Sequence, residues 1–148
     1  MKRLKLLLLI ATIVLFAACE RPVKYNDDEL KEMAITYKLI EGAWELREWQ
    51  GNSLADGTFL YVKFDGAEHR FEMWDNLGSM YVEYTTGMFS ITQDENGDYM
   101  LTGQYDYGVG DWKNDYRVKM MANCNEMLWA TDDEYMIFSK IDAIPEFN

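Results

Sequence analysis

The sequence predicts an all-β protein, an eight-stranded antiparallel up-and-down barrel preceded by a short N-terminal helix. From Ala43 onward, runs rich in Val, Ile, Tyr, Phe, Trp and Thr show a period of two, and short clusters of Gly, Asn and Asp separate them. None of these gaps has room for a crossover helix, so we expect neighbouring strands to pair antiparallel. An open sheet of eight strands has two unpaired edges, and closing it into a barrel removes both.

The eight expected strands follow directly from these runs. They cover residues 43–50, 58–64, 67–74, 80–92 with a kink at Gly87, 99–105, 115–122, 126–130 and 135–140. Asp65-Gly66 predicts a two-residue hairpin loop of the type I′ class, because both residues tolerate positive φ angles. The segments 94–98, 123–125 and 131–134 are equally typical of turns.

A helix is expected before the first strand, over residues 26–40. Asn26 is a suitable N-cap, and Glu29 stands three residues later, as in a capping box. Apolar residues then recur at near-helical spacing from Leu30 to Ile40, and Gly42 is a plausible stop. We therefore predict a helix of about three turns that lies against the barrel.

The N-terminus has the pattern of a secretory signal. Lys2, Arg3 and Lys5 precede an uncharged apolar run that reaches Cys19, and this run is too short to favour a stable membrane span. The residues Phe16-Ala17-Ala18-Cys19 resemble a lipobox, with Phe16 where the family usually has Leu. The resemblance implies cleavage before Cys19 and a diacylglycerol anchor on that cysteine.

These features divide the chain into four parts. We expect a lipoprotein signal peptide over residues 1–18, a lipidated tether over 19–28, a barrel domain with its N-terminal helix over 29–142, and a C-terminal tail over 143–148. The expected location is the outer membrane or the cell surface, with the chain held to the membrane through the lipid on Cys19.

The charge of the chain limits its partners. Its formal charge is −12, and removal of residues 1–18 deletes three positive charges and takes it to −15. Nucleic acid is a poor partner for such a surface, because phosphate recognition depends on Lys and Arg. The same field attracts cations and basic proteins.

The sequence offers no set of residues typical of an enzyme, and we predict no catalytic residues, metal site or cofactor. Once Cys19 carries lipid, Cys124 has no second cysteine for a disulfide, and it lies in a turn. The spacing Asp94-x-Asn96-x-Asp98 imitates the start of a calcium loop, but Tyr99 stands where glycine is required. We interpret this segment as a hairpin turn.

The first strand carries a family resemblance. Gly42-Ala43-Trp44, placed before eight β runs, resembles the Gly-x-Trp motif of the lipocalin (calycin) superfamily, and in particular the lipocalin-like lipoproteins of Bacteroides-type bacteria. The resemblance covers residues 42–140. It implies that Trp44 closes one end of the barrel and that a basic residue of the last strand, here Lys140, stacks on it, although the family residue is normally Arg.

Alternation sorts the remaining side chains by face. The candidate ligand-lining residues are Val62, Phe64, Phe71, Met73, Phe89, Tyr99, Leu101, Tyr105 and Tyr116. An eight-stranded barrel either fills its interior with such side chains or holds one small ligand. The sequence does not decide between the two.

A second aromatic set is expected on the opposite face, at strand ends or in loops. It consists of Trp49, Tyr61, Trp74, Tyr105, Tyr107, Trp112 and Tyr135. Tyr107 and Trp112 are the candidate rim contacts, because Gly108 and Gly110 make their loop flexible. The alternative is that this loop folds Trp112 back onto the sheet.

Two functions remain open. The first is binding of a small apolar or aromatic ligand by the barrel. The second is a protein-interaction module, such as an inhibitor or an accessory subunit of an outer-membrane complex, which has a solid core and contacts a basic partner.

Overall fold

The computed structural model describes residues 33–108, 110–121 and 123–147. The expected signal peptide, the lipidated tether with Cys19 and the first part of the expected helix lie outside these ranges. The elements follow the chain in this order: α3 (Tyr37–Ile40), β1 (Gly42–Trp49), β2 (Asn52–Ser53), β3 (Leu60–Asp65), β4 (Arg70–Asp75), β5 (Glu83–Gln93), β6 (Tyr99–Tyr105), β7 (Tyr116–Met120), β8 (Glu126–Ala130) and β9 (Tyr135–Ile141). Within these ranges, no helix has the length and apolarity needed to cross a membrane.

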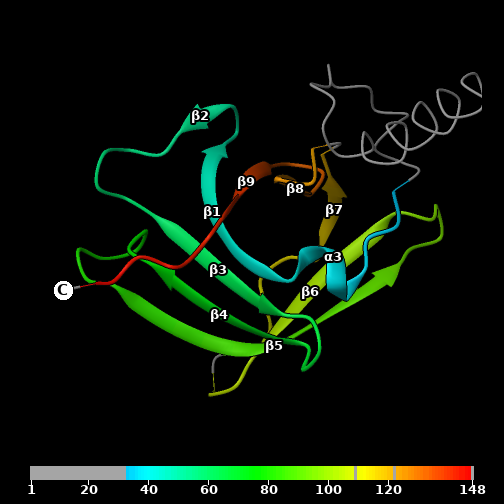
Figure 1. Ribbon diagram of the computed structural model, residues 1–148, viewed down its shortest axis with the longest axis horizontal. Helices are drawn as coiled ribbons and strands as arrows, with labels where there is room; N and C mark the ends of the chain where they lie inside the picture. Colours follow the sequence, from blue (N-terminus) through cyan, green and yellow to red (C-terminus); the bar gives the residue numbers. More distant parts are fainter. Residues whose placement is uncertain (1–32, 109, 122, 148) are drawn as a thin grey trace, which may run out of the picture.

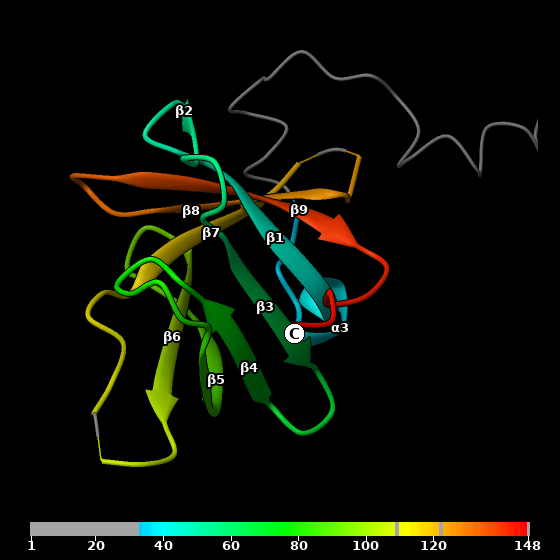
Figure 2. The same ribbon diagram turned by 90° about the vertical axis from the view of Figure 1, so that its left-hand side faces the viewer.

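The strands form a closed antiparallel barrel. Pairing runs in sequence order from β1–β3 to β8–β9, and β9 then pairs with β1 and closes the ring. Figure 1 looks into this ring, with α3 lying across it, and Figure 2 shows the tilted strands from the side. The small strand β2 stands outside the ring and pairs with the end of β1. The predicted fold class is confirmed.

The observed strands differ little from the expected ones. β6 and β8 have the predicted bounds, and β5 begins at Glu83 instead of residue 80. β5 also runs through Gly87 without a break in its pairing. Residues 94–98 form the expected hairpin turn. The Gly97 N–H donates to the Asp94 carbonyl, and the Asp94 carboxylate accepts from the backbone N–H groups of Asn96 and Asp98.

The expected helix is much shorter than predicted within the described residues. Residues 33–36 are not helical, and α3 begins only at Tyr37. Thr36 is its N-cap, with an extended backbone and a side chain that accepts from Leu39 N–H at 3.1 Å. This local cap satisfies a helix-terminal donor, so α3 begins at Tyr37. The predicted N-cap at Asn26 lies outside the described residues.

The β3–β4 hairpin also differs from the prediction. Asp65 pairs with Arg70, so the loop has four residues, 66–69, and not two. The Asp65 carboxylate accepts from Ala67 N–H and Glu68 N–H, and His69 takes the positive φ of 55°. An Asp side chain that bonds its own loop stabilises this longer turn.

The two ends of the barrel differ. The loops β3–β4, β5–β6 and β7–β8 lie at the same end as α3, which we call the α3 end. The loops β1–β3, β4–β5, β6–β7 and β8–β9 lie at the other end, which we call the open end because α3 does not cover it. The C-terminal tail runs back along the outside, where Phe147 stacks on Phe59 of the β1–β3 loop at 5.1 Å.

Candidate functional site

The α3 end is closed by Trp44. Its side chain is fully buried, and its indole N–H donates to the carbonyl of Ile40 in α3 at 2.8 Å. Lys140 is the register partner of Trp44 on β9, and its Nζ lies 5.3 Å from the indole centroid. Gly42 has a φ of +114°, and a Cβ there would lie 3.2 Å from Lys140 Cε. A ligand therefore has no direct entry at this end.

Most of the candidate lining residues form a packed core. Five of them are at most 3% exposed: Val62, Phe64, Phe71, Phe89 and Leu101. The Phe64 and Phe89 rings meet edge to face at 4.7 Å, and Phe64 also lies 6.1 Å from Trp129. In the half of the barrel nearer α3, side chains fill the interior.

Trp112 completes this core from a loop. Its backbone N–H donates to the Gly103 carbonyl at 2.8 Å. The loop is thus bonded to β6 beyond the point where the two-residue ladder between β6 and β7 ends. Its indole is 8% exposed and lies over Gly103, where a Cβ would come within 2.2 Å of the ring. It stacks on Trp129 at 5.4 Å and meets Phe71 at 5.0 Å. The loop thus folds Trp112 back onto the sheet, the alternative given above, and Trp112 is not an exposed rim residue.

Tyr107, the other candidate rim residue, is 85% exposed. It lies at the open end, in the same loop as Trp112. Exposed apolar side chains also gather in the adjacent β4–β5 loop and the start of β5, namely Leu77, Met80, Tyr81, Val82 and Tyr84. We call these five residues the apolar loop.

The inward-facing residues change character toward the open end. Met73, Tyr105 and Tyr116 are only half-buried, and Leu60 shares their face. Tyr99 is half-buried as well, but it lies at the α3 end of β6, away from the other three. The structure therefore brings Met73, Tyr105 and Tyr116 together at the open end and leaves Tyr99 apart.

One acidic side chain acts on each of these two tyrosines, Tyr105 and Tyr116. Burial, followed by the negative charge of Asp75, raises the pKa of Tyr105. Burial also raises the pKa of Tyr116, with a further contribution from Glu134, while a hydrogen bond from Asn114 acts in the opposite direction. None of the ion pairs among the described residues includes Asp75 or Glu134. Each tyrosine therefore has one carboxylate nearby that no described ion pair neutralises.

Trp49 belongs to this group, although sequence alternation put it on the opposite face. A bulge at Arg47 shifts the register, so that Trp49 pairs with the inward-facing Met136. Its indole N–H donates to Glu134 Oε2 at 3.3 Å, and Asn114 Nδ2 donates to Glu134 Oε1 at 3.3 Å. The segment has no glycine or other local sign of a bulge, and only the pairing with β9 reveals it.

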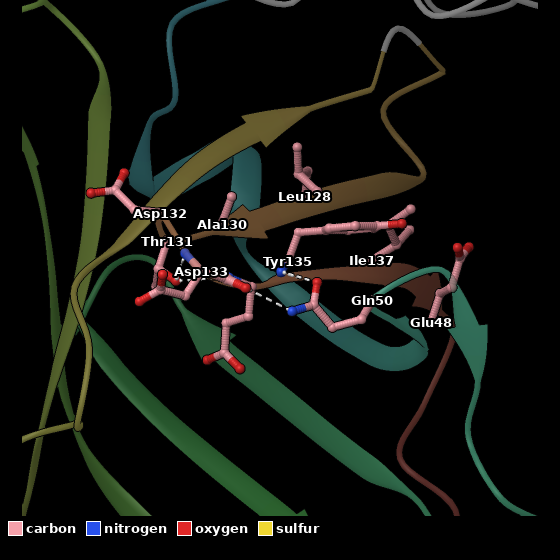
Figure 3. A pocket seen from close by; sticks show the side chains of 10 residues that line it. Glu48, Gln50, Leu128, Ala130, Thr131, Asp132, Asp133, Tyr135 and Ile137 are labelled. Carbon is pink, nitrogen blue, oxygen red and sulfur yellow. Dashed lines mark hydrogen bonds between the residues drawn. The ribbon is translucent and has the colours of Figure 1, made fainter.

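A groove lies on the outside of the barrel, next to this end. It has a volume of about 640 Å³ and lies between the end of β1 and the β8–β9 hairpin. Figure 3 shows Tyr135 and Ile137 in its middle, Glu48 at one end and Asp132 and Asp133 at the other. We call it the outer groove; it is lined by Glu48, Gln50, Leu128, Ala130, Thr131, Asp132, Asp133, Glu134, Tyr135 and Ile137.

The described residues contain no group of three or more His, Cys, Asp or Glu side chains arranged to hold a metal ion. His69 stacks face to face on Tyr37 at 3.7 Å in the β3–β4 loop, whereas Cys124 lies in the β7–β8 loop with a φ of +57°. The two residues lie in different hairpin loops, where His69 packs against Tyr37 and Cys124 adopts the positive φ of a turn.

A closed meander of eight antiparallel strands, with one end covered by a short helix and a Gly-x-Trp tryptophan, defines a lipocalin-like barrel. Among solved structures, the chain is similar to a lipocalin-like protein from Bacteroides uniformis ATCC 8492, with 14% identity and a TM-score of 0.50 over 70% of this chain and 99% of that one. At this identity the similarity establishes the fold. No protein-family model matches the sequence. No curated protein matches it either.

Proposed function

We propose that the protein is a membrane-anchored extracytoplasmic binding protein that takes a small apolar or aromatic molecule at the open end of its barrel. The observation that carries this proposal is the change along the inward faces, from fully buried at Phe71 to half-buried at Met73. Side chains that are fully buried have no surface left for a ligand, whereas Leu60, Met73, Tyr105 and Tyr116 keep some. Lipocalin-like barrels are suited to holding one small ligand.

The chemistry at this end narrows the ligand class. Met adapts to varied shapes, and a tyrosine offers an apolar ring with a polar tip. Asp75 and Glu134 lie close enough to Tyr105 and Tyr116 to raise their pKa values. An anionic ligand would be repelled there, so the site favours a neutral or cationic molecule.

Native mass spectrometry of the protein isolated from its membranes, before and after organic extraction, tests the proposal. We expect a non-covalent ligand that extraction removes. The extracted protein should then bind the neutral fluorescent probe N-phenyl-1-naphthylamine. Met73→Glu should weaken this binding at least tenfold, because a carboxylate would have to leave water to face the probe.

Met88→Glu is the matched control, since Met88 lies on the outer face of β5 and is 49% exposed. We expect its probe affinity to stay within twofold of the parent, and thermal melts of both variants report on folding. Equal affinities for the two variants, or a protein that carries no extractable ligand and does not bind the probe, would contradict ligand binding at the open end.

We also propose that lipid on Cys19 supplies the anchor. The described chain begins at Met33, which shares a hollow with Asn96 and Tyr99 at the α3 end. An attachment upstream of Met33 would tether this end and leave the open end accessible. Cys19→Ala should move the protein from the membrane fraction to the soluble fraction, because a diacyl anchor provides two acyl chains for stable binding. Cys124→Ala is the control and should stay with the membrane; a Cys19→Ala protein that remained membrane-bound would refute the anchor.

The apolar loop favours a second candidate, the protein-interaction module. Met80 is 90% exposed and Tyr81 is 78% exposed, and monomeric proteins seldom expose neighbouring large apolar side chains without a use for them. A basic protein that binds with strong salt dependence and loses affinity on Tyr81→Ser, in a preparation that lacks any small ligand, would support this candidate over the first.

A further inference from the structure

We propose that the outer groove is a second binding site, separate from the open end, and that it binds an extended basic segment of a polypeptide. Its volume of about 640 Å³ lies in the range of ligand sites, roughly 300–1,000 Å³. The groove is on the outer face of the barrel, so the packed interior does not limit access to it. The proposal does not depend on ligand binding at the open end.

The floor of the groove is apolar. Leu128 and Ile137 are register partners on β8 and β9, and the next outward-facing pair is Ala130 and Tyr135. These positions alternate with the buried, inward-facing Met127 and Trp129. The result is a strip of outward-facing aliphatic and aromatic surface, against which the methylene stem of Lys or Arg can pack.

Carboxylates stand at both ends of this strip. Glu48 pairs with Ile137 at one end, and Asp132 and Asp133 lie in the β8–β9 turn at the other (Figure 3). Asp132 bonds Arg117 at 2.8 Å, but no ion pair of the described chain includes Glu48 or Asp133. Among the described residues that line the groove, none is Lys, Arg or His. An apolar strip between Glu48 and Asp133, the two carboxylates without an ion pair, complements a segment that carries basic residues.

The walls of the groove are fixed by Gln50. This residue has a φ of +53°, a conformation that a non-glycine residue adopts at a cost in energy. Its side chain offsets that cost by donating from Nε2 to the Asp133 carbonyl at 2.8 Å and accepting from Tyr135 N–H at 3.2 Å. Its own N–H bonds to the Tyr135 carbonyl at 3.0 Å. Gln50 thus joins the β1–β2 hairpin to the β8–β9 hairpin through three hydrogen bonds. The groove between these hairpins is therefore formed before a ligand binds.

An extended polypeptide fits better than a free cation. The carboxylates stand at opposite ends of the apolar strip, with Ala130, Tyr135 and Ile137 between them (Figure 3). A small inorganic cation would contact the carboxylates of one end alone. An extended segment with apolar and basic residues can contact the strip and the carboxylates of both ends.

The test uses the full mature protein and a fluorescein-labelled hexapeptide that alternates Leu and Lys, followed by fluorescence anisotropy. The double variant Glu48→Gln/Asp133→Asn removes two groove charges without changing side-chain size. We expect it to weaken peptide binding at least tenfold. The matched control is Asp56→Asn/Glu68→Gln, which removes two exposed charges elsewhere and should change affinity less than twofold.

Three outcomes would overturn the proposal. Equal weakening by both double variants would mean that the peptide follows the net charge of the surface. Equal binding of a hexapeptide with Glu in place of Lys would remove the charge argument. Competition by spermidine at the same affinity as the peptide would show that the groove takes free cations and not a polypeptide. In ¹⁵N NMR spectra, shifts on peptide addition should centre on Gln50, Leu128 and Ile137.

Discussion

The Trp112→Ala variant should lose about 3–5 kcal/mol of unfolding free energy, the cost typical of deleting a buried aromatic side chain. Trp112 is 8% exposed, and its ring fills the space that Gly103 leaves on β6. The deletion would also remove its contacts with Phe71 and Trp129. Urea denaturation followed by circular dichroism measures the change.

Two variants serve as controls for this prediction. Trp112→Phe keeps an aromatic ring and removes an indole N–H that is buried without a hydrogen-bond partner, so its loss should be below about 1.5 kcal/mol. Tyr107→Ala, in the same loop but exposed, should change stability by less than about 0.5 kcal/mol. If Trp112→Ala were as mild as Tyr107→Ala, Trp112 would be a rim residue after all and the loop would not be part of the core.

The regular part of the fold could be predicted because it rests on local signals. β6 and β8 have the expected bounds, since their alternation is uninterrupted and polar turns flank both. Strand bounds of this kind depend on period and order, which a sequence displays directly. The contact between Trp44 and Lys140 was implied by the lipocalin resemblance, and the closure of β9 on β1 makes the two residues register partners.

The residues of the open end could be predicted only in part. Tyr105 and Tyr116 follow from alternation, but Trp49 does not, because one extra residue at Arg47 reverses its face. Glu134 and Asn114 come from loops, where no period applies, and they reach the site through their bonds to Trp49 and Tyr116. Sites built at strand ends therefore depend on register and loop conformation, which are tertiary properties.

The outer groove could not be predicted from the sequence either, for a different reason. Leu128 and Ile137 are ordinary outward-facing strand residues, and what makes them a floor is the β1–β2 hairpin beside them. Gln50 fixes that hairpin, and nothing in the residue type predicts its positive φ. Gly51 follows Gln50, so a turn could be predicted at this position. The bonds from the Gln50 side chain to the β8–β9 hairpin could not be predicted.

Gly87→Ala should be the most damaging single-methyl substitution in the sheet, with a loss of about 3 kcal/mol, the upper part of the range for overpacking. A Cβ at this position would lie 2.0 Å from the Gln104 carbonyl oxygen and 2.6 Å from Phe71 Cε1. The carbonyl belongs to β6, whose ladder with β5 runs through this point, so it cannot move without breaking backbone bonds.

Gly78→Ala is the matched control, since nothing lies within 4 Å of a Cβ there. It should be neutral or stabilise by up to about 1 kcal/mol, because it restricts the unfolded chain. Comparable stability of the two variants in urea would contradict close approach at Gly87. β5 passes from β4 to β6 at this glycine without a positive φ, and what the sheet requires there is the missing side chain. Without a Cβ at 87 the β5 and β6 backbones can approach each other beside the Phe71 ring, which packs against Trp112 at 5.0 Å.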